Sequence, residues 1–264
     1  MKKIISGGLA LAMALMASTA QAQSTAKPTI LLVHGAFADS SSWNGVTARL
    51  QRDGYRVIAA PNPLRGVRAD ADVVADVAKS VDGPVVLVGH SYGGSVISEA
   101  GSGETGRGAA NVKALVYVAA FAPEEGETAL GLTGKFPGST LGPTLAPPVK
   151  LSSGGNDLYI RQNLFPAQFA ADVPAQAARL MAAGQRPIAE AALNEPESAP
   201  AWKHIPSWFI YGDGDRNIPP AAMAFMAERA RSRQTVVVKG ASHVLMISHP
   251  EQVVALIEKA ATAP

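Results

Sequence analysis

The chain has 264 residues, no cysteine and a formal net charge of +2. Without cysteine it can form no disulfide framework, no thiol nucleophile and no thiolate-ligated metal site. Lys2 and Lys3 stand in a leader-like segment, and without them the formal charge is zero, so the charge gives no indication of a nucleic-acid partner. The remaining chain of about 240 residues is long enough to bury one full core, as a single α/β domain does.

The first segment, residues 1–22, has the pattern of a secretory signal peptide. Two lysines precede a short apolar run, and Ala20-Gln21-Ala22 supplies an A-x-A cleavage site. The apolar run is too short for a convincing membrane span, and a retained anchor is the alternative. We therefore expect cleavage at the end of this segment, a catalytic domain over residues 23–264, no stable membrane anchor after cleavage, and a periplasmic or secreted protein.

Short apolar, β-branched runs then alternate with alanine-rich helical stretches, a pattern typical of a parallel sheet covered on both faces. We expect an α/β fold with a mostly parallel central sheet of about six strands, which start near Thr29, Tyr55, Val85, Ala114, Ser207 and Thr235. The expected helices cover residues 43–53, 69–81, 92–100, 221–231 and 251–260. The last helix would begin with a capping box from Ser248 to Glu251, with Pro250 in its first turn.

The strand that starts near Thr29 runs into His34-Gly35-Ala36-Phe37. A glycine at this point lets the loop backbone approach a reaction centre closely. It also leaves the Ala36 N–H free to point inward as a donor to an oxyanion.

The strand that starts near Val85 is followed by the G-x-S-x-G pattern of residues 89–93, with Ser91 at its centre. In this nucleophile elbow a strand turns sharply into a helix, and the two glycines leave room for a strained bend that exposes the serine hydroxyl. The helix that follows directs N–H groups, with that of Tyr92 beside the Ala36 N–H, toward the place where an oxyanion would form. Ser91 is therefore a candidate nucleophile; the alternative is an ordinary Gly/Ser loop after a strand.

Residues 123–201 interrupt the alternation of strands and helices. Their first part is rich in Gly, Pro, Ser and Thr, whereas residues 172–183 have helical periodicity. We expect a cap over the elbow that excludes water and shapes the substrate pocket; the alternative, a long surface loop without structure, is uncommon at this length. Phe37, Phe121 and Met246 are the expected pocket residues, and they predict an apolar pocket.

Two late strands end in loops that carry an acid and a histidine. The strand near Ser207 is followed by Asp213 and Asp215, and the strand near Thr235 is followed by His243. Serine, then acid, then histidine is one of the three known chain orders of a catalytic triad.

With these motifs the chain resembles the α/β-hydrolase superfamily, in which the triad has this order. Within it, the chain is similar to the branch of hydroxynitrile lyases and plant methylesterases with its bacterial esterase-like relatives. The resemblance covers nearly all of the chain after the leader, and it implies Ser91 as nucleophile, His243 as general base and acid, and Asp215 as the partner that orients the histidine. In the family pattern a glycine, two residues and the acid are followed by two residues, an apolar residue and a proline, which favours Asp215 over Asp213. Asp213 is expected to cap its own turn.

The resemblance also implies that the backbone amides of Ala36 and Tyr92 form the oxyanion hole. The lyases of this branch carry a threonine where this chain has Gly35 and a lysine where it has Val244, and both groups handle the substrate in cyanohydrin cleavage. We therefore expect a serine hydrolase that cleaves carboxylic esters of small to medium apolar substrates through an acyl-enzyme. Hydroxynitrile lyase-like or perhydrolase activity, and a non-catalytic small-molecule binding protein on the same fold, stay open as alternatives.

The other histidines give no indication of a metal site. His34 and His90 lie in the motif loops and are expected to pack or hydrogen-bond beneath the site, whereas His204 and His249 flank elements at the surface. The sequence contains no short-spaced ligand motif such as H-E-x-x-H, and no cofactor is expected. A small-molecule ester is the expected partner, and a homodimer is compatible with the sequence.

Overall fold

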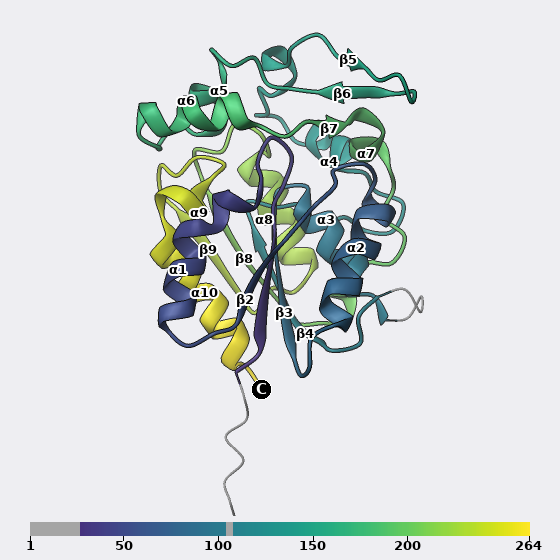
Figure 1. The fold of residues 1–264 in the computed structure, drawn as a ribbon, viewed down its shortest axis with the longest axis vertical. Coiled ribbons are helices and arrows are strands. Elements are labelled where there is room, and N and C mark those ends of the chain that lie inside the picture. Colours follow the sequence, from purple (N-terminus) through teal and green to yellow (C-terminus); the bar gives the residue numbers. More distant parts are fainter. Residues whose placement is uncertain (1–26, 104–107) are drawn as a thin grey trace, which may run out of the picture.

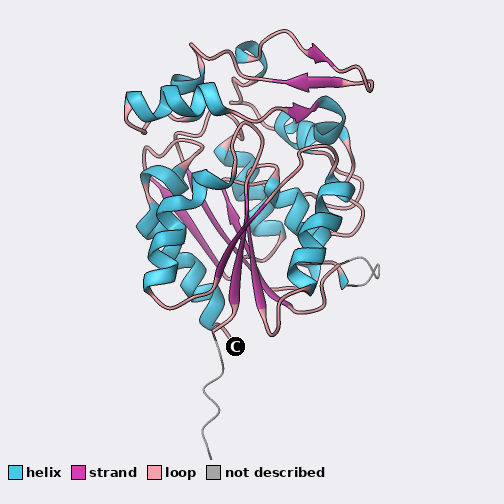
Figure 2. Cartoon of the chain, in the orientation of Figure 1, coloured by secondary structure: helices cyan, strands magenta, loops and turns pink. Residues whose placement is uncertain are grey.

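The computed structural model describes residues 27–103 and 108–264, so the predicted signal peptide lies outside the described residues. The central sheet has six parallel strands in the order β2-β1-β3-β4-β8-β9 (Figure 2). In that order the strands are Val57–Ala60, Thr29–Val33, Val85–His90, Val112–Val118, Ser207–Gly212 and Gln234–Val238. Strands β1, β3 and β8 are buried along their whole length, which explains their near-continuous apolar sequences.

Helices cover both faces of this sheet (Figure 1). Helices α1 and α10 pack against each other on one side, and α2 and α3 pack against each other on the other side. The helices that flank the sheet are α1 (Asn44–Arg52), α2 (Val67–Lys79), α3 (Gly93–Ala100), α8 (Pro220–Arg229), α9 (Leu245–Ser248) and α10 (Pro250–Thr262). Their buried positions recur at spacings of three and four; in α2 they include Ala71, Val74, Ala75 and Ala78.

The structure confirms the predicted α/β-hydrolase fold with a parallel sheet of six strands and flanking helices. One local prediction is wrong: α10 has no capping box. Its N-cap residue is His249, which makes no side-chain cap, and the hydroxyl of Ser248 instead bonds His249 Nδ1 at 2.9 Å. Pro250 does occupy the first turn, where its missing N–H costs no helical hydrogen bond.

Residues 123–201, here called the inserted segment, connect β4 to β8, and the helices and small sheet within this segment lie above the edge of the central sheet at which the strands end (Figure 1). The expected helix over 172–183 is present as α6, and the segment also contains a small antiparallel sheet in the order β5-β6-β7 that the sequence did not predict. These strands have two or three residues, too few to give an alternating pattern. The elements are α4 (Ala129–Lys135), β5 (Val149–Lys150), β6 (Asn156–Leu158), α5 (Phe165–Phe169), α6 (Ala175–Gly184), β7 (Ile188–Ala189) and α7 (Glu190–Asn194).

The order of strands in the sheet reverses at β1. The chain passes from β1 to β2 on one side and then returns to β3 on the other side of β1. In open α/β sheets the loops that leave the strands on either side of such a reversal diverge and form a crevice. The two loops here are the one that carries Ala36, after β1, and the one that carries Ser91, after β3.

Candidate active site

Ser91 occupies a sharp turn between β3 and α3. Its φ of +53° lies in the left-handed region, which is strained for a residue with a side chain. Both glycines of the pattern are required: a Cβ at Gly89 would lie 2.5 Å from the Gly93 carbonyl oxygen, and one at Gly93 would lie 2.6 Å from the Val33 carbonyl oxygen. The turn is closed by the Gly94 N–H, which donates to the Ser91 carbonyl at 2.9 Å. The Ser91 side chain therefore has a fixed place at the wall of a cavity.

Strained backbone is concentrated around this turn. Phe37 and Ala119 also have left-handed φ values, +60° and +44°, and the Ser91 N–H donates to the Ala119 carbonyl at 3.1 Å. Such residues persist only where the surrounding contacts over-determine them, and they gather at functional sites. The loops after β1, β3 and β4 thus meet in one strained cluster.

Gly35 is held free of a side chain by the nucleophile elbow. A Cβ atom at this position would lie 2.6 Å from Ser91 Cβ, 2.7 Å from the His90 carbonyl oxygen and 3.1 Å from His90 Nδ1. This packing explains the glycine without reference to the reaction. The sequence argument used Gly35, in place of the lyases' threonine, as support for an esterase. In this structure no threonine fits at position 35, so Gly35 does not distinguish an esterase from a lyase.

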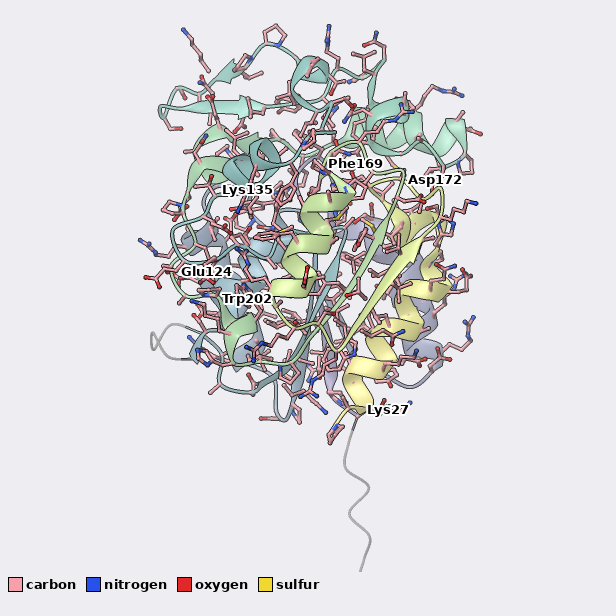
Figure 3. All side chains as sticks on the ribbon, turned by 180° about the vertical axis from the view of Figure 1, so that it is seen from behind. Lys27, Glu124, Lys135, Phe169, Asp172 and Trp202 are labelled. Atoms are coloured by element: carbon pink, nitrogen blue, oxygen red, sulfur yellow. The ribbon has the colours of Figure 1, made fainter. Side chains whose placement is uncertain are left out.

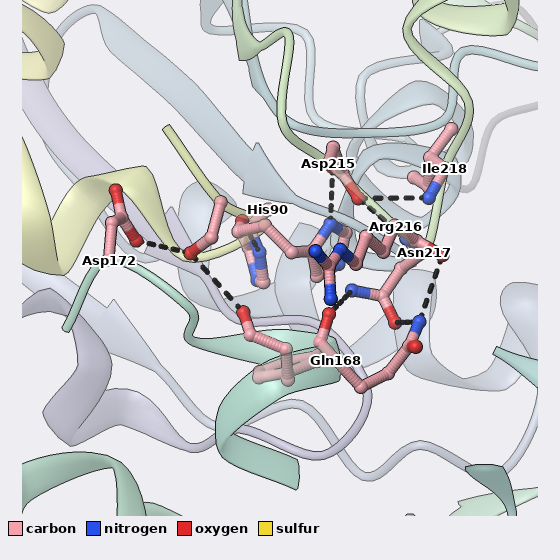
Figure 4. A network of polar contacts seen from close by, with 10 residues as sticks. His90, Gln168, Asp172, Asp215, Arg216, Asn217 and Ile218 are labelled. Atoms are coloured by element: carbon pink, nitrogen blue, oxygen red, sulfur yellow. Dashed lines mark hydrogen bonds and ion pairs between the residues drawn. The ribbon is translucent and has the colours of Figure 1, made fainter. Parts of the chain in front are cut away.

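His243 and Asp215 form a buried pair, with Asp215 Oδ2 2.7 Å from His243 Nδ1. Both are almost fully buried. The other carboxylate oxygen of Asp215 accepts hydrogen bonds from the Asn217 N–H at 2.7 Å and the Ile218 N–H at 3.1 Å (Figure 4). Asp213 does not cap its own turn as expected: its carboxylate accepts from the Gly240 N–H at 2.5 Å, which belongs to the neighbouring loop after β9.

Ser91 and His243 line the same cavity, and no hydrogen bond joins the hydroxyl to the imidazole among the described residues. Such bonds are often loose before substrate binds. The structure thus brings the three expected residues into one site and places Asp215, not Asp213, against the histidine.

The expected oxyanion donors, the N–H groups of Ala36 and Tyr92, belong to residues that line this cavity. Within the described ranges neither N–H donates a hydrogen bond to another residue. The next amide in the first loop, that of Phe37, is already committed to the Arg186 carbonyl at 2.9 Å. The backbone N–H groups of Ala36, after β1, and Tyr92, after β3, are therefore both free to donate to an oxyanion in the cavity.

The phenol of Tyr92 donates a hydrogen bond to Asp70 Oδ2 at 2.9 Å, and this bond fixes the position of the Tyr92 side chain. The same carboxylate accepts from the Arg65 N–H, at 3.1 and 3.2 Å to its two oxygens. Burial raises the pKa of Asp70, although these hydrogen bonds oppose the rise. Asp70 links α2 to the elbow, a role that no motif in the sequence indicated.

His34 and His90 lie beneath the site, as expected. His90 Nε2 is 3.0 Å from the His243 carbonyl oxygen, to which it donates. Burial, followed by the proximity of His243, holds the pKa of His90 well below its ordinary value, so the ring is neutral. His34 Nε2 accepts from the Asn62 N–H at 3.3 Å, and burial lowers its pKa as well. Of the histidines expected at the surface, His204 is exposed and His249 is half-buried near Asp172.

The cavity above Ser91 has a volume of about 600 Å³. Phe37 and Phe121 line it as expected, but Met246 does not. Met246 lies in α9, three positions after His243, and its side chain is fully buried in the core. Apolar side chains from the inserted segment form much of the remaining wall: Ala129, Leu130, Leu141, Leu145, Ala146, Pro147, Pro148, Leu158, Phe169 and Leu193.

The inserted segment also touches the histidine itself. The centroid of the Phe169 ring lies 5.0 Å from that of His243 and 6.1 Å from that of Phe37. Figure 3 labels Phe169 and, close to it, Asp172. Asp172, three residues further on, accepts a hydrogen bond from the Ser242 hydroxyl next to His243. These contacts were not predicted, because the residues involved are separated by about seventy positions and lie in no motif.

No group of three or more His, Cys, Asp or Glu side chains with the arrangement of a metal site occurs in the described part of the chain. Over residues 27–103 and 108–264, no helix is both long and apolar enough to cross a membrane.

Comparison with known proteins gives one family. The sequence model of a family described as the alpha/beta hydrolase family matches residues 30–256. An alpha/beta hydrolase of Aspergillus novofumigatus, nvfD, is 28% identical over 249 residues, which cover 89% of this chain and 97% of that protein. A carbendazim hydrolyzing esterase of a Nocardioides species is 33% identical over 117 residues, which cover 40% of this chain and 47% of that protein.

Solved structures with the same fold include polyneuridine aldehyde esterase, at a TM-score of 0.74 and 18% identity, with 88% of this chain and 98% of that chain covered. A pyrethroid hydrolase from Sphingobium faniae JZ-2 gives a TM-score of 0.70 and 23% identity, with 90% of this chain and 98% of that chain covered.

Proposed function

The chain belongs to the alpha/beta hydrolase family, and on that premise we propose that it is a carboxylesterase that hydrolyses small to medium, neutral, apolar esters through Ser91, His243 and Asp215. The observation that carries the proposal is the buried pair of His243 and Asp215, joined at 2.7 Å, on the wall of a cavity that also exposes Ser91. The esterases and hydrolases among the similar proteins support the same class of reaction.

The reaction begins when Ser91 Oγ attacks the ester carbonyl and His243 Nε2 accepts the hydroxyl proton. The new bond joins Oγ to the carbonyl carbon, and the electron pair of the C=O bond moves onto its oxygen. Asp215, which accepts from His243 Nδ1–H, stabilises the imidazolium. When the tetrahedral intermediate collapses, the alcohol leaves with the proton from Nε2, and the acyl group stays on Ser91.

Water then repeats the sequence on the acyl-enzyme. His243 takes a proton from the water, hydroxide bonds to the acyl carbon, and Ser91 leaves with the proton as the acid is released. In both halves the N–H groups of Ala36 and Tyr92, free of other partners, hold the oxyanion. Loss of one such donor typically raises the barrier by about 3 kcal/mol.

The inserted segment acts as the cap in this proposal. Its aliphatic side chains and the rings of Phe37, Phe121 and Phe169 line the cavity, so a neutral apolar acyl or alcohol group gains from burial. Exclusion of water from the site strengthens the interactions of the oxyanion with its donors. A volume of about 600 Å³ suits substrates of moderate size.

Ser91→Ala tests the proposal directly. The purified protein is assayed on p-nitrophenyl esters of graded acyl length and, in parallel, on mandelonitrile. We expect ester hydrolysis by the native protein, no cyanide release above the spontaneous rate, and loss of nearly all ester turnover in the variant. Ser95→Ala is the matched control: its buried hydroxyl, one turn along α3, has no hydrogen-bond partner in the described structure.

Two outcomes contradict the proposal. If Ser91→Ala keeps more than a few per cent of the native activity, or if a fluorophosphonate labels another serine, the nucleophile is misassigned. If mandelonitrile is cleaved efficiently while esters are not, the chain is a lyase of the same fold.

A further inference from the structure

The side chain of Gln168, at the end of α5 in the inserted segment, is buried against the loop that carries the candidate acid. Its Nε2 donates to the Arg216 carbonyl at 2.9 Å and to Asn217 Oδ1 at 3.1 Å. The Asn217 side chain returns a hydrogen bond from Nδ2 to the Gln168 carbonyl at 3.2 Å (Figure 4). The two amides therefore form a reciprocal clamp between the inserted segment and the loop after β8.

This clamp lies one residue from Asp215. The N–H of Asn217 donates to Asp215 Oδ1 at 2.7 Å, and that bond turns the other oxygen, Oδ2, toward His243. A loop that carries several buried polar groups keeps one conformation only while each group has a partner. Gln168 supplies the donor to the Asn217 amide oxygen and a second donor to the Arg216 carbonyl, which also accepts from the Thr140 N–H at 2.9 Å.

The orientation of the Gln168 amide is itself fixed. The Thr140 hydroxyl donates to Gln168 Oε1 at 2.9 Å, which directs Nε2 to the acid loop. Gln168 does not line the cavity, so a substrate in the cavity does not touch its side chain.

We propose that Gln168 is a positioning residue for ester hydrolysis: its amide donors hold the 216–217 backbone so that Asp215 stays aligned with His243. The proposal rests on the proposed function. It also means that the inserted segment contributes to turnover as well as to substrate fit. Gln168 acts through Arg216 and Asn217 and makes no contact with the reacting atoms.

The proposal predicts a specific kinetic pattern. When Gln168 loses its donors, Asp215 stabilises the His243 imidazolium less well, so kcat should fall by about tenfold to a hundredfold. KM should stay within about twofold, because Gln168 itself does not line the cavity. The acid limb of the profile of kcat/KM against pH should move to lower pH, since a histidine with a weaker carboxylate partner is protonated less readily. A side chain that only supports folding would not move this limb.

The experiment compares Gln168→Leu, which removes the amide, with Gln168→Met, which keeps the length of the side chain but offers no donor and no charge. Asn111→Leu is the matched control, because the Asn111 amide donates to the carbonyls of Ala78 and Val81 at the opposite end of the sheet. Circular dichroism and thermal unfolding establish that each variant folds. If Gln168→Leu does not fold, Gln168→Met, which has nearly the same length and shape as glutamine, is the variant used for the test.

A lower kcat with a displaced acid limb in the Gln168 variants, and neither change in Asn111→Leu, supports the proposal. A native kcat and pH profile in both folded Gln168 variants overturns it, as does the same kinetic change in Asn111→Leu. Ser91→Ala, measured in the same series, keeps the two proposals apart. If that variant retains ester turnover, the proposed function fails; if it is inactive while the Gln168 variants behave as the native protein, only the role of Gln168 fails.

Discussion

Gly35→Ala adds one methyl group at the point where the loop after β1 meets the nucleophile elbow. The new Cβ would lie 2.6 Å from Ser91 Cβ and 2.7 Å from the His90 carbonyl oxygen. Carbon atoms in contact normally lie about 3.5 to 4.0 Å apart. The two loops must therefore separate by about 1 Å, and neither neighbour is a flexible side-chain end that can turn away.

The cost of that separation should appear in activity before it appears in stability. A displacement of about 1 Å in a reacting group can lower the rate about a hundredfold, which corresponds to about 2.7 kcal/mol of transition-state stabilisation. Overpacking in a tight interior typically costs about 1–3 kcal/mol of folding free energy. We therefore expect a folded Gly35→Ala protein whose kcat/KM for p-nitrophenyl butyrate is about one hundredth of the native value.

The control for this experiment is Gly134→Ala. Gly134 lies in α4 with no neighbouring atom within 4 Å of an added Cβ, so the same substitution should leave kcat/KM unchanged and should not destabilise the helix. Urea unfolding of both variants gives the stability difference. If Gly35→Ala has native kcat/KM and a native unfolding midpoint, the steric reasoning is wrong, and Gly35 regains its value as a marker of reaction class.

Two further predictions concern carboxylates. Asp215→Asn should lower kcat by about 10⁴-fold, because the imidazole loses the partner that fixes its tautomer and stabilises its charge. Asp213→Asn should lower kcat by less than about tenfold. A larger loss of kcat for Asp213→Asn would assign the orienting role to Asp213. Burial, followed by the contact with Glu99, raises the pKa of Glu197, so the folded chain keeps a proton that the unfolded chain releases above about pH 4.3. Stability should therefore fall as the pH rises from there toward the raised pKa, and Glu197→Gln should flatten that fall; equal differences between the urea midpoints of variant and native protein at pH 5 and pH 8 would contradict it.

The parts of the site that could be predicted are those for which local geometry dictates residue type. Gly89 and Gly93 stand where any side chain would collide with backbone, so the elbow leaves a mark in the sequence. The acid and histidine loops follow adjacent strands, and their chain order supplied the rest. Met246 shows the limit of this reasoning, because proximity to His243 along the chain does not fix the direction of a side chain in a short helix.

The contacts of the inserted segment could not be predicted for a different reason. Helix α5 has five residues, too few for a periodic pattern, and the Gln168 amide and the Phe169 ring meet partners from Thr140, 28 positions away, to Phe37, 132 positions away. Gln168 and Phe169 make their contacts with the acid loop and with His243 as buried residues. They become buried only when the inserted segment has folded onto the rest of the protein. Gly35 is the opposite case, because it was singled out in the sequence for another reason. The need for glycine at this position comes from its close approach to Ser91, which exists only when the two loops have packed together.

The strained loops and the inserted segment depend on each other. Residues with left-handed φ at Phe37 and Ser91 need contacts that exclude their relaxed conformations. For Phe37 one such contact is the hydrogen bond to the Arg186 carbonyl, and another is the edge of the Phe169 ring; both partners belong to the inserted segment. The segment that shapes the cavity therefore also holds the loop that carries the Ala36 N–H, the proposed donor to the oxyanion. Because the same segment lines the cavity and contacts this loop, we expect changes in it that widen the cavity to alter turnover together with substrate range.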